Sequence, residues 1–178
     1  MPWCPRGAYG VAIIKVLLQS VQNKGDGMHG TIAKLFSFDA GLKMPPEVIG
    51  EVPEGIRVNF YLTGGSISGE RLNGRLEPAG ADWLLLRRDG VGVVDVRATM
   101  VSNDGALIYT HYTGVLDAGP DGYAAFLEGR LPPTMPIRTA PRFHTAHTDY
   151  LWLNRLQAFS VGTVDMGAAK VSYDVYGA

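Results

Sequence analysis

The sequence predicts an all-β fold, a small antiparallel β-barrel with a long lid-like connection and one or two short helices. Several short segments alternate apolar with polar residues, which is typical of half-buried strands. Turn signals recur at short intervals, at Asn73-Gly74, Ala79-Gly80 and Asp89-Gly90. The chain holds 23 glycines among 178 residues, and this leaves little room for long helices. Together these features favour many short antiparallel strands arranged in a barrel or a sandwich.

Three parts of the chain give the clearest strand patterns. In residues 56–65, "IRVNFYLTGG", apolar and polar positions alternate until two glycines, which we expect to end the strand. Residues 83–87 and 93–101 predict two strands that flank a turn at Asp89-Gly90. The C-terminal segment 169–177, "AKVSYDVYG", alternates in the same way and predicts the last strand.

Helical signals are sparse and the longest connection lacks a strand pattern. The best helix candidates are residues 123–128 and a turn near 150–156. The connection over residues 117–143, "DAGPDGYAAFLEGRLPPTMPIRTAPRF", is longer than compact domains usually contain without a purpose. Its apolar residues indicate that it packs against the domain. Two interpretations stay open: a lid over a binding site, or a plug at one end of the barrel without a role in ligand binding.

The length of the chain suits one folded domain, which we place at residues 28–178. Residues 1–27 differ in character and are predicted to be an N-terminal extension, either disordered or the product of a mis-assigned start before Met28. The apolar run in residues 9–22 is shorter than the roughly 20 residues that a membrane span requires. No small-residue cleavage site follows it, so a signal peptide is not favoured.

Charge and cysteine content narrow the classes of partner. Sixteen basic and seventeen acidic residues give a formal net charge of -1. Such a chain has no long-range field that would gather nucleic acid or an anionic membrane, and we expect neither as a partner. Cys4 is the only cysteine, so no internal disulfide can form, which is compatible with a cytoplasmic protein.

The hairpin "VRATMVSNDGALIYTHYTG", residues 96–114, carries the first candidate site. A three-residue loop, 103–105, with its glycine in the left-handed conformation fits a type I turn followed by a G1 bulge. In that register Arg97 lies opposite His111. A two-residue loop would place Arg97 opposite Tyr112 instead, and the polar cluster would not form.

In the three-residue register, Asp95 and Arg97 share a face with Tyr109 and His111. This face has two interpretations. If it is a solvated outer surface, the exposed ion pair contributes about 0 to 1 kcal/mol to stability. If it lines the barrel interior, Asp95 could act as a base or orient one, Arg97 could stabilise an oxyanion, and Tyr109 or His111 could shuttle protons.

Four further residues are candidates for ligand binding. Arg142 and Arg155 can either pin loops by hydrogen bonding to carbonyl groups or clamp a substrate carboxylate, phenolate or enolate at the barrel mouth. Tyr61 and Trp83 complete the set, although a tryptophan such as Trp83 more often belongs to the core.

Other motifs fail on inspection. "GGSISG", residues 64–69, lacks serine at the central position of a nucleophile elbow. "GVGVVD", residues 90–95, lacks the third glycine and the helix of a dinucleotide-binding loop. "HTAHTD" brings His144, His147 and Asp149 close in sequence, but their spacing suits no named metal site. We therefore predict neither a metal nor a cofactor.

Several long blocks in order resemble one protein family. They are "VPEGIRVNFYLTGGSISGERLNGRLEPAGADWLLLRRDGVGVVDVRATMVSNDGALIYTHYTGVL", "RTAPRFHTAHTDYLWLNRLQAFSVG" and the terminal "YDVY". Over residues 35–176 the chain resembles the bacterial and fungal family catalogued as domain of unknown function 3237. The resemblance implies a small antiparallel β-barrel and little about activity. It draws attention to these blocks: Gly64-Gly65, Asp82-Trp83, Asp95-x-Arg97, Tyr109, 138–143 and 152–155.

Two functions of different classes remain. The first is a cofactor-independent enzyme of isomerase, lyase or cyclase type, which acts by acid–base chemistry on a small hydrophobic or aromatic carbonyl compound bound in the barrel. The second is a non-catalytic carrier or sensor of the same class of small molecule. A structural subunit that forms a homodimer through exposed strand edges is a third alternative.

Overall fold

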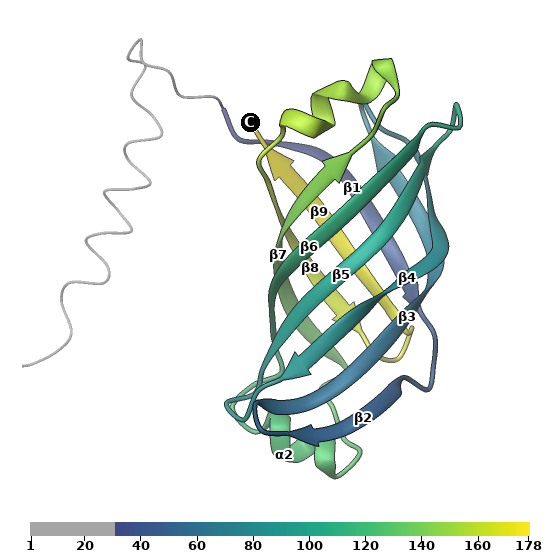
Figure 1. Ribbon diagram of the computed structural model, residues 1–178. Coiled ribbons are helices and arrows are strands. Elements are labelled where there is room, and N and C mark those ends of the chain that lie inside the picture. The colour runs from purple at the N-terminus through teal and green to yellow at the C-terminus, as the bar shows by residue number, and fades with distance from the viewer. Residues whose placement is uncertain (1–30) are drawn as a thin grey trace, which may run out of the picture. The chain divides into compact units, whose positions relative to one another are not determined.

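The computed structural model describes residues 31–178, so the predictions for residues 1–27 lie outside the described residues (Figure 1). Neither helix in this part of the chain is long and apolar enough to cross a bilayer. The elements follow in the order β1 (Ala33–Leu42), β2 (Glu47–Val52), β3 (Gly55–Gly69), β4 (Gly74–Leu86), β5 (Val91–Ser102), β6 (Leu107–Asp117), α2 (Gly122–Leu127), β7 (Thr134–His144), the 3₁₀-helix η1 (Thr148–Arg155), β8 (Ala158–Asp165) and β9 (Lys170–Gly177).

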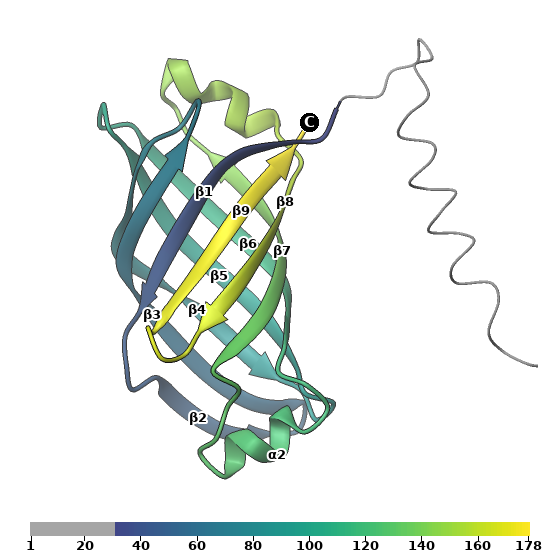
Figure 2. The same ribbon diagram turned by 180° about the vertical axis from the view of Figure 1, so that it is seen from behind.

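The strands form one antiparallel sheet that closes into a barrel, which confirms the predicted fold class. Their order is β1-β9-β8-β7-β6-β5-β4-β3-β2, and an additional pairing between β1 and β3 closes the ring. Strand β2 is an extra strand that pairs with the first part of β3 (Figure 2). Within residues 31–178, closure pairs the barrel strands on both sides over most of their length, whereas β2 pairs with β3 on one side only.

Two glycine sites bend strands where the sequence predicted a strand end, at Gly64-Gly65, and a turn, at Ala79-Gly80. Strand β3 continues past Gly64-Gly65, with a register shift between Tyr61 and Gly65. Strand β4 likewise continues through Gly80, and both Gly64 and Gly80 have positive φ, 103° and 108°. Glycine adopts this conformation at little cost, so these sites act as bulges that curve the strands. The bend lets β3 pair with β2 in its first part and with β1 in its second.

The register predicted for the β5–β6 hairpin is confirmed. The backbone N–H of Ser102 donates to the carbonyl of Ala106 at 3.0 Å, and Gly105 has a φ of 90°. Arg97 consequently pairs with His111. Turn chemistry therefore sets this register, because the left-handed glycine fixes the loop at three residues.

Only the first half of the long connection lacks a strand. Helix α2 matches the helix predicted at residues 123–128, but the second half of the connection forms strand β7, which the sequence did not predict. Two prolines within β7 explain why the sequence did not predict this strand. Pro136 lies outside the part of β7 that pairs with β6, and Pro141 lies outside the part that pairs with β8. Each proline therefore sits where one side of the strand is unpaired and its missing N–H is tolerated.

The barrel interior differs between its two ends. At the end covered by η1 it is tightly packed: Leu153 is buried, and Phe36 contacts Phe143 edge to face at a centroid distance of 5.7 Å. The opposite end, where β2 and α2 lie (Figures 1 and 2), contains a cavity. Side chains fill the end near η1, whereas the cavity at the other end leaves room for a ligand.

Candidate functional site

The polar face of the β5–β6 hairpin lies on the outside of the barrel. Asp95 and Arg97 form an ion pair at 3.1 Å with side chains 42% and 51% exposed. Tyr109 is exposed and His111 is half-buried. Of the two interpretations, the solvated outer surface therefore agrees with the structure, and the interior position that an enclosed site would require is wrong. The opposite face of the hairpin is the inward one, and it consists of Val96, Ala98, Met100, Ile108, Thr110 and Tyr112.

Tyr61 and Trp83 also lie on the outer face. The hydroxyl of Tyr61 donates to Glu47 Oε2 at 2.9 Å, and its ring is exposed. Trp83 is half-buried beneath the guanidinium of Arg97, whose central carbon lies 5.4 Å from a ring centroid. Trp83 thus makes a cation–π contact on the surface and is neither a core residue nor part of the cavity lining.

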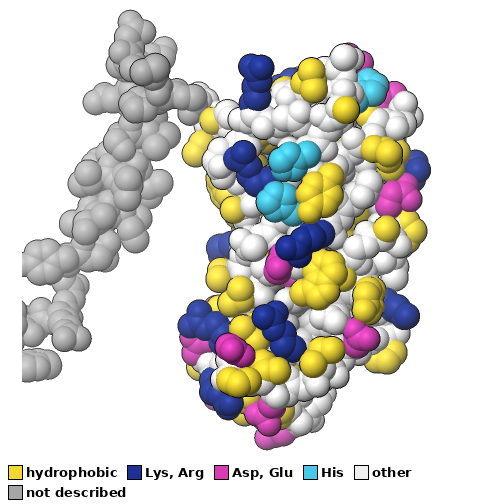
Figure 3. Space-filling view, viewed as in Figure 1, with side chains coloured by type: hydrophobic (Ala, Val, Ile, Leu, Met, Phe, Trp, Pro, Cys, Tyr) yellow, Lys and Arg dark blue, Asp and Glu magenta, His cyan; other side chains and the backbone are white. Residues whose placement is uncertain are grey.

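Arg142 extends this outer face, but Arg155 lies elsewhere. Arg142 is opposite His111 in the β6–β7 pairing and donates to Gln157 Oε1 at 2.7 Å. The ring of His111 stacks on that of His144, with centroids 5.7 Å apart and planes at 12°. Figure 3 shows histidine, arginine and hydrophobic side chains gathered on this face. Arg155 is exposed at the end of η1. None of these groups reaches the cavity.

The surface position of the ion pair gives a testable expectation. Replacing Asp95 by Asn should change the free energy of unfolding by no more than about 1 kcal/mol, because exposed ion pairs contribute little. Urea denaturation of both proteins measures this difference. A loss of several kcal/mol would show that the carboxylate has a buried role that its exposure does not reveal.

The residues of "HTAHTD" separate in the structure. His144 faces outward on β7, whereas His147 and Asp149 meet Asp104 of the β5–β6 loop. One donor atom from each of these three residues lies within 4.8 Å of the others, so they could hold a cation. Asp104 also accepts a hydrogen bond from the Tyr150 hydroxyl at 3.1 Å. The two carboxylates are exposed, and such clusters commonly stay solvated without an ion.

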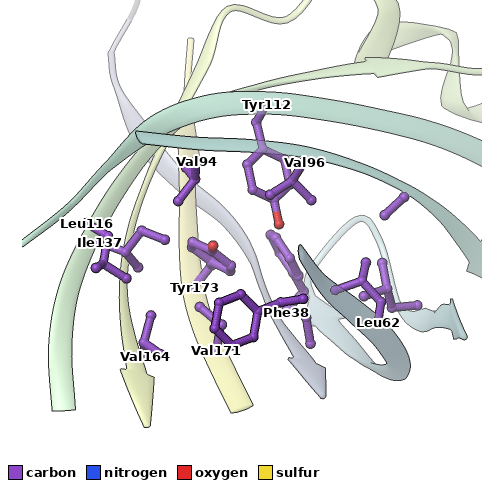
Figure 4. Close-up of a cluster of buried hydrophobic side chains, with 14 of the residues drawn as sticks. Phe38, Leu62, Val94, Val96, Tyr112, Leu116, Ile137, Val164, Val171 and Tyr173 are labelled. Carbon is purple, nitrogen blue, oxygen red and sulfur yellow. The ribbon is translucent and has the colours of Figure 1, made fainter. Parts of the chain in front are cut away.

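A cavity of about 50 Å³ occupies the barrel interior near α2. Its lining is apolar except for three side chains, Asp82, Tyr112 and Tyr173. Figure 4 shows the two tyrosines among the buried apolar side chains of the barrel. No arginine, lysine or histidine of residues 31–178 lines it. The polar chemistry of the cavity therefore rests on one carboxyl group and two phenols.

Asp82 faces inward because it shares its strand face with Leu84 and Leu86. The backbone N–H of Asp95 donates to Asp82 Oδ1 at 3.0 Å. The carboxyl keeps some accessible surface because it borders the cavity, but its surroundings are apolar. Burial raises the pKa of Asp82 to about 7, against the hydrogen bond from Asp95, which lowers it. Near neutral pH this group is therefore present both as an acid and as a base.

Tyr112 and Tyr173 form an aromatic floor between the cavity and the packed end. Their rings meet edge to face at a centroid distance of 5.7 Å, and Phe38 stacks on Tyr173 at 4.8 Å. Burial raises the pKa of both phenols, and the charge of Asp82 raises both further. The two hydroxyls thus stay protonated, and because they hydrogen-bond to each other, one O–H remains to donate to a ligand.

The sequence does not assign this site, although the family resemblance draws attention to Asp82-Trp83. The predicted strand begins at residue 83, one position too late to include Asp82, and Trp83 is the candidate taken from that block. The hairpin register places Tyr112 on the face opposite Arg97 and His111, and Tyr173 belongs to the alternating segment 169–177, so neither tyrosine is predicted to have a role in a site. The signal for the site is the carboxyl of Asp82, which alternates in step with Leu84 and Leu86 and so lies alone on the apolar face of a barrel strand.

An open groove lies outside the cavity at the same end of the barrel. It measures about 610 Å³ and is bordered by β2, by α2 and by the segment that follows α2. The groove and the cavity share four lining residues: Phe60, Phe126, Leu131 and Met166. The same side chains therefore form the inner wall of the groove and the outer wall of the cavity.

Known proteins resemble the chain in sequence and in structure. UPF0311 protein RPA1785 of Rhodopseudomonas palustris is 30% identical over 129 residues, covering 71% of this chain and 83% of that protein. A beta-barrel like protein from Acinetobacter baumannii superposes with a TM-score of 0.70 at 27% identity, covering 84% of this chain and 97% of that one. A protein from Penicillium herquei, described as an enzyme, shares the fold with a TM-score of 0.57 at 20% identity, covering 84% and 98%.

The family match spans nearly all of the barrel. The family described as "Protein of unknown function (DUF3237)" matches residues 31–178, which is the part of the chain that the structure describes. The Rhodopseudomonas relative bears a family name without an activity. On this match and this relative, the chain belongs to the DUF3237 family.

Proposed function

We propose that the protein is a cofactor-independent enzyme that moves protons on a small hydrophobic carbonyl compound, with Asp82 as its acid–base group. One observation supports this above others: a carboxyl with a pKa of about 7 stands in a hydrocarbon-lined cavity. General acid–base catalysis works best when the pKa of the group is close to the working pH. Isomerase, lyase or cyclase chemistry would use such a group.

The proposed reaction divides between the three polar groups of the cavity. The ionised carboxylate of Asp82 removes a proton from the carbon next to the substrate carbonyl, and the electron pair moves to form an enolate. A hydroxyl from Tyr112 or Tyr173 donates a hydrogen bond to the enolate oxygen, which stabilises the developing charge. Asp82 then returns its proton to the same carbon or to another one. Return to another carbon is an isomerisation, and no cofactor is needed.

The comparisons add limited support. The Penicillium herquei protein is described as an enzyme and has this barrel fold, so the fold can accommodate chemistry. The roles that the sequence suggested for Asp95 and Arg97 pass to groups inside the barrel, because both side chains are exposed.

Hydrogen exchange of a model ketone tests the proposal. The protein is expected to accelerate deuterium uptake from D₂O at the carbon beside the carbonyl of 2-tetralone, followed by ¹H NMR. The rate should rise through an apparent pKa of about 7 because the base must be ionised. Asp82→Asn should slow exchange by a factor of about 10² or more, since the amide keeps the shape and loses the basicity. Asp95→Asn is the matched control: it should keep the wild-type rate above about pH 7, and its rise should shift to lower pH because it removes the charge of Asp95, which adds to the pKa of Asp82.

Two results would overturn the enzyme assignment: exchange at the buffer rate, or exchange that Asp82→Asn leaves unchanged. The second candidate function is then a carrier or sensor. Apart from three side chains the cavity lining is hydrocarbon, which is typical of sites that bind apolar small molecules. Such a protein would bind 2-tetralone without accelerating its exchange.

A further inference from the structure

We infer that the substrate is an uncharged molecule in two parts: an oxygen-bearing end that enters the cavity beside Asp82, and an apolar body that lies in the groove between β2 and the segment after α2. This inference rests on the proposed function, because it names the substrate class of the same site.

Volume separates the two parts. The cavity holds about 50 Å³ and the groove about 610 Å³. Sites for small molecules typically measure about 300 to 1,000 Å³, so the cavity alone is too small and the groove has the usual size. A ligand that reaches Asp82 must therefore keep most of its body outside the cavity.

Side chains separate the cavity from the groove. Phe126 and Leu131 come from the connection between β6 and β7, and Met166 comes from the turn after β8. All three are only half-buried. The backbone N–H of Met166 donates to the carbonyl of Pro133 at 2.9 Å, which ties the two segments together. The flexible Met166 side chain can move aside more easily than backbone can. A passage needs only rotation of these side chains.

Charge determines the class of the ligand. The cavity contains Asp82 and no cationic side chain. The one charged residue of the groove is also acidic: Glu51, which accepts a hydrogen bond from Tyr123 and lies 3.9 Å from Arg88. An anionic ligand would enter between two carboxylates without a partner in the lining, and burying an unpaired charge is costly. A cationic ligand would hold Asp82 ionised, which conflicts with its cycle of losing and regaining a proton. An uncharged ligand meets neither penalty.

A matched pair of fluorescent probes tests the charge requirement. N-phenyl-1-naphthylamine is neutral, and 1-anilinonaphthalene-8-sulfonate adds one sulfonate to the same rings. At about pH 8.5 the wild-type protein should bind the neutral probe at least about tenfold more tightly. Near pH 5 this ratio should fall at least about threefold, because Asp82 is then protonated. Among the groups near Asp82, Tyr112 and Tyr173 stay neutral at both pH values. Asp95 lies on the outer face, and Glu51 lies in the groove.

The Asp82→Asn variant tests whether Asp82 causes the dependence of probe binding on pH. In Asp82→Asn the preference for the neutral probe should lose most of its dependence on pH. A wild-type ratio that stays constant between the two pH values, or tighter binding of the sulfonate, would overturn the charge requirement.

A second pair of variants tests the groove. Val48→Asp places a charge in the groove, whereas Val115→Asp places one on the outer face of β6, and both valines are exposed, 52% and 48%. Val48→Asp should weaken the neutral probe by at least about fivefold, and Val115→Asp by less than about twofold. Equal effects would exclude the groove as the binding surface.

The two proposals can fail separately. If Asp82→Asn stops the exchange of 2-tetralone but Val48→Asp leaves probe binding unchanged, the two-part substrate is wrong and the proposed function stands. If Val48→Asp weakens the probe and Asp82→Asn leaves exchange unchanged, the binding path stands and the enzyme does not.

Discussion

Replacing Asp82 by Asn is expected to stabilise the barrel at alkaline pH by up to about 4 kcal/mol, since one unit of pKa corresponds to about 1.4 kcal/mol. Burial raises the pKa of this carboxyl from 3.8 to about 7. Ionised Asp82 therefore destabilises the folded state relative to the unfolded chain. Asparagine keeps the acceptor for the backbone N–H of Asp95 and never ionises.

The sign and the pH range follow from the two pKa values. Below about 4 the carboxyl is protonated in both states, so it contributes no dependence on pH. Between about 4 and 7 the folded protein keeps a proton on Asp82 that the unfolded chain has lost, so the contribution of Asp82 to stability falls as pH rises. Carboxyls whose pKa is lowered, such as Asp39 and Asp174, act in the opposite sense in both proteins, so the comparison with Asp82→Asn isolates this contribution. Above about 7 both states are ionised, and the full difference from the asparagine variant persists.

Urea denaturation of both proteins across this pH range measures the difference directly. The advantage of Asp82→Asn should grow between pH 4 and 7 and then level off. Asp95→Asn is the control, because the exposed carboxyl of Asp95 pairs with Arg97 on the surface. Its effect should be small and should come from the charge of Asp95, which adds to the pKa of Asp82. An advantage that does not change with pH, or a wild type that is more stable than Asp82→Asn at alkaline pH, would contradict the buried position of Asp82.

This destabilising group has no structural compensation inside the barrel. Its hydrogen bond from Asp95 could be made equally by an asparagine, and no cation of residues 31–178 lines the cavity beside it. Residues that reduce stability and make no structural interaction that offsets the loss are concentrated at functional sites. The energetic argument and the chemical argument thus point to the same residue.

The sequence predicts much of the fold, and it predicts the hairpin register by turn chemistry alone. Choosing the inward face was a different problem. The interpretation that placed Asp95 and Arg97 inside assumed that clustered ionisable residues mark a site in the interior. A closed barrel this narrow instead fills its interior with apolar side chains. The apolar face of a barrel hairpin should be taken as the inward one. A lone carboxyl on such a face, as Asp82 is on β4, is then the residue to examine.

Two other departures arise from glycines and prolines. The sequence predicts a strand end at Gly64 and a turn at Gly80 because glycine marks such places, but the same backbone freedom allows a bulge within a strand. The prolines of β7 hid a strand because their tolerance depends on where pairing stops, which neighbouring residues do not reveal. Both outcomes depend on how distant strands pair, and a local sequence pattern carries no information about that.

Replacing Phe38 by Ala is expected to destabilise the protein by about 3 to 5 kcal/mol, as large deletions in tightly packed cores do. Phe38 is 4% exposed and stacks on Tyr173, with Tyr112 at a centroid distance of 6.4 Å. Removing its ring also removes the support of the aromatic floor. Both hydroxyls should then lose their fixed positions, and exchange of 2-tetralone should slow by about tenfold or more.

Phe36→Ala is the matched control for this second effect. Phe36 is equally buried and contacts Phe143 at the packed end of the barrel, so its loss should cost a similar free energy of unfolding. It lines neither the cavity nor the groove, and exchange by the folded variant should stay within about threefold of wild type. Equal slowing in the two variants would mean that overall stability limits exchange, and the tyrosines would then have no specific role. Slowing in Phe38→Ala alone would assign the positioning of the two hydroxyls to the ring beneath them.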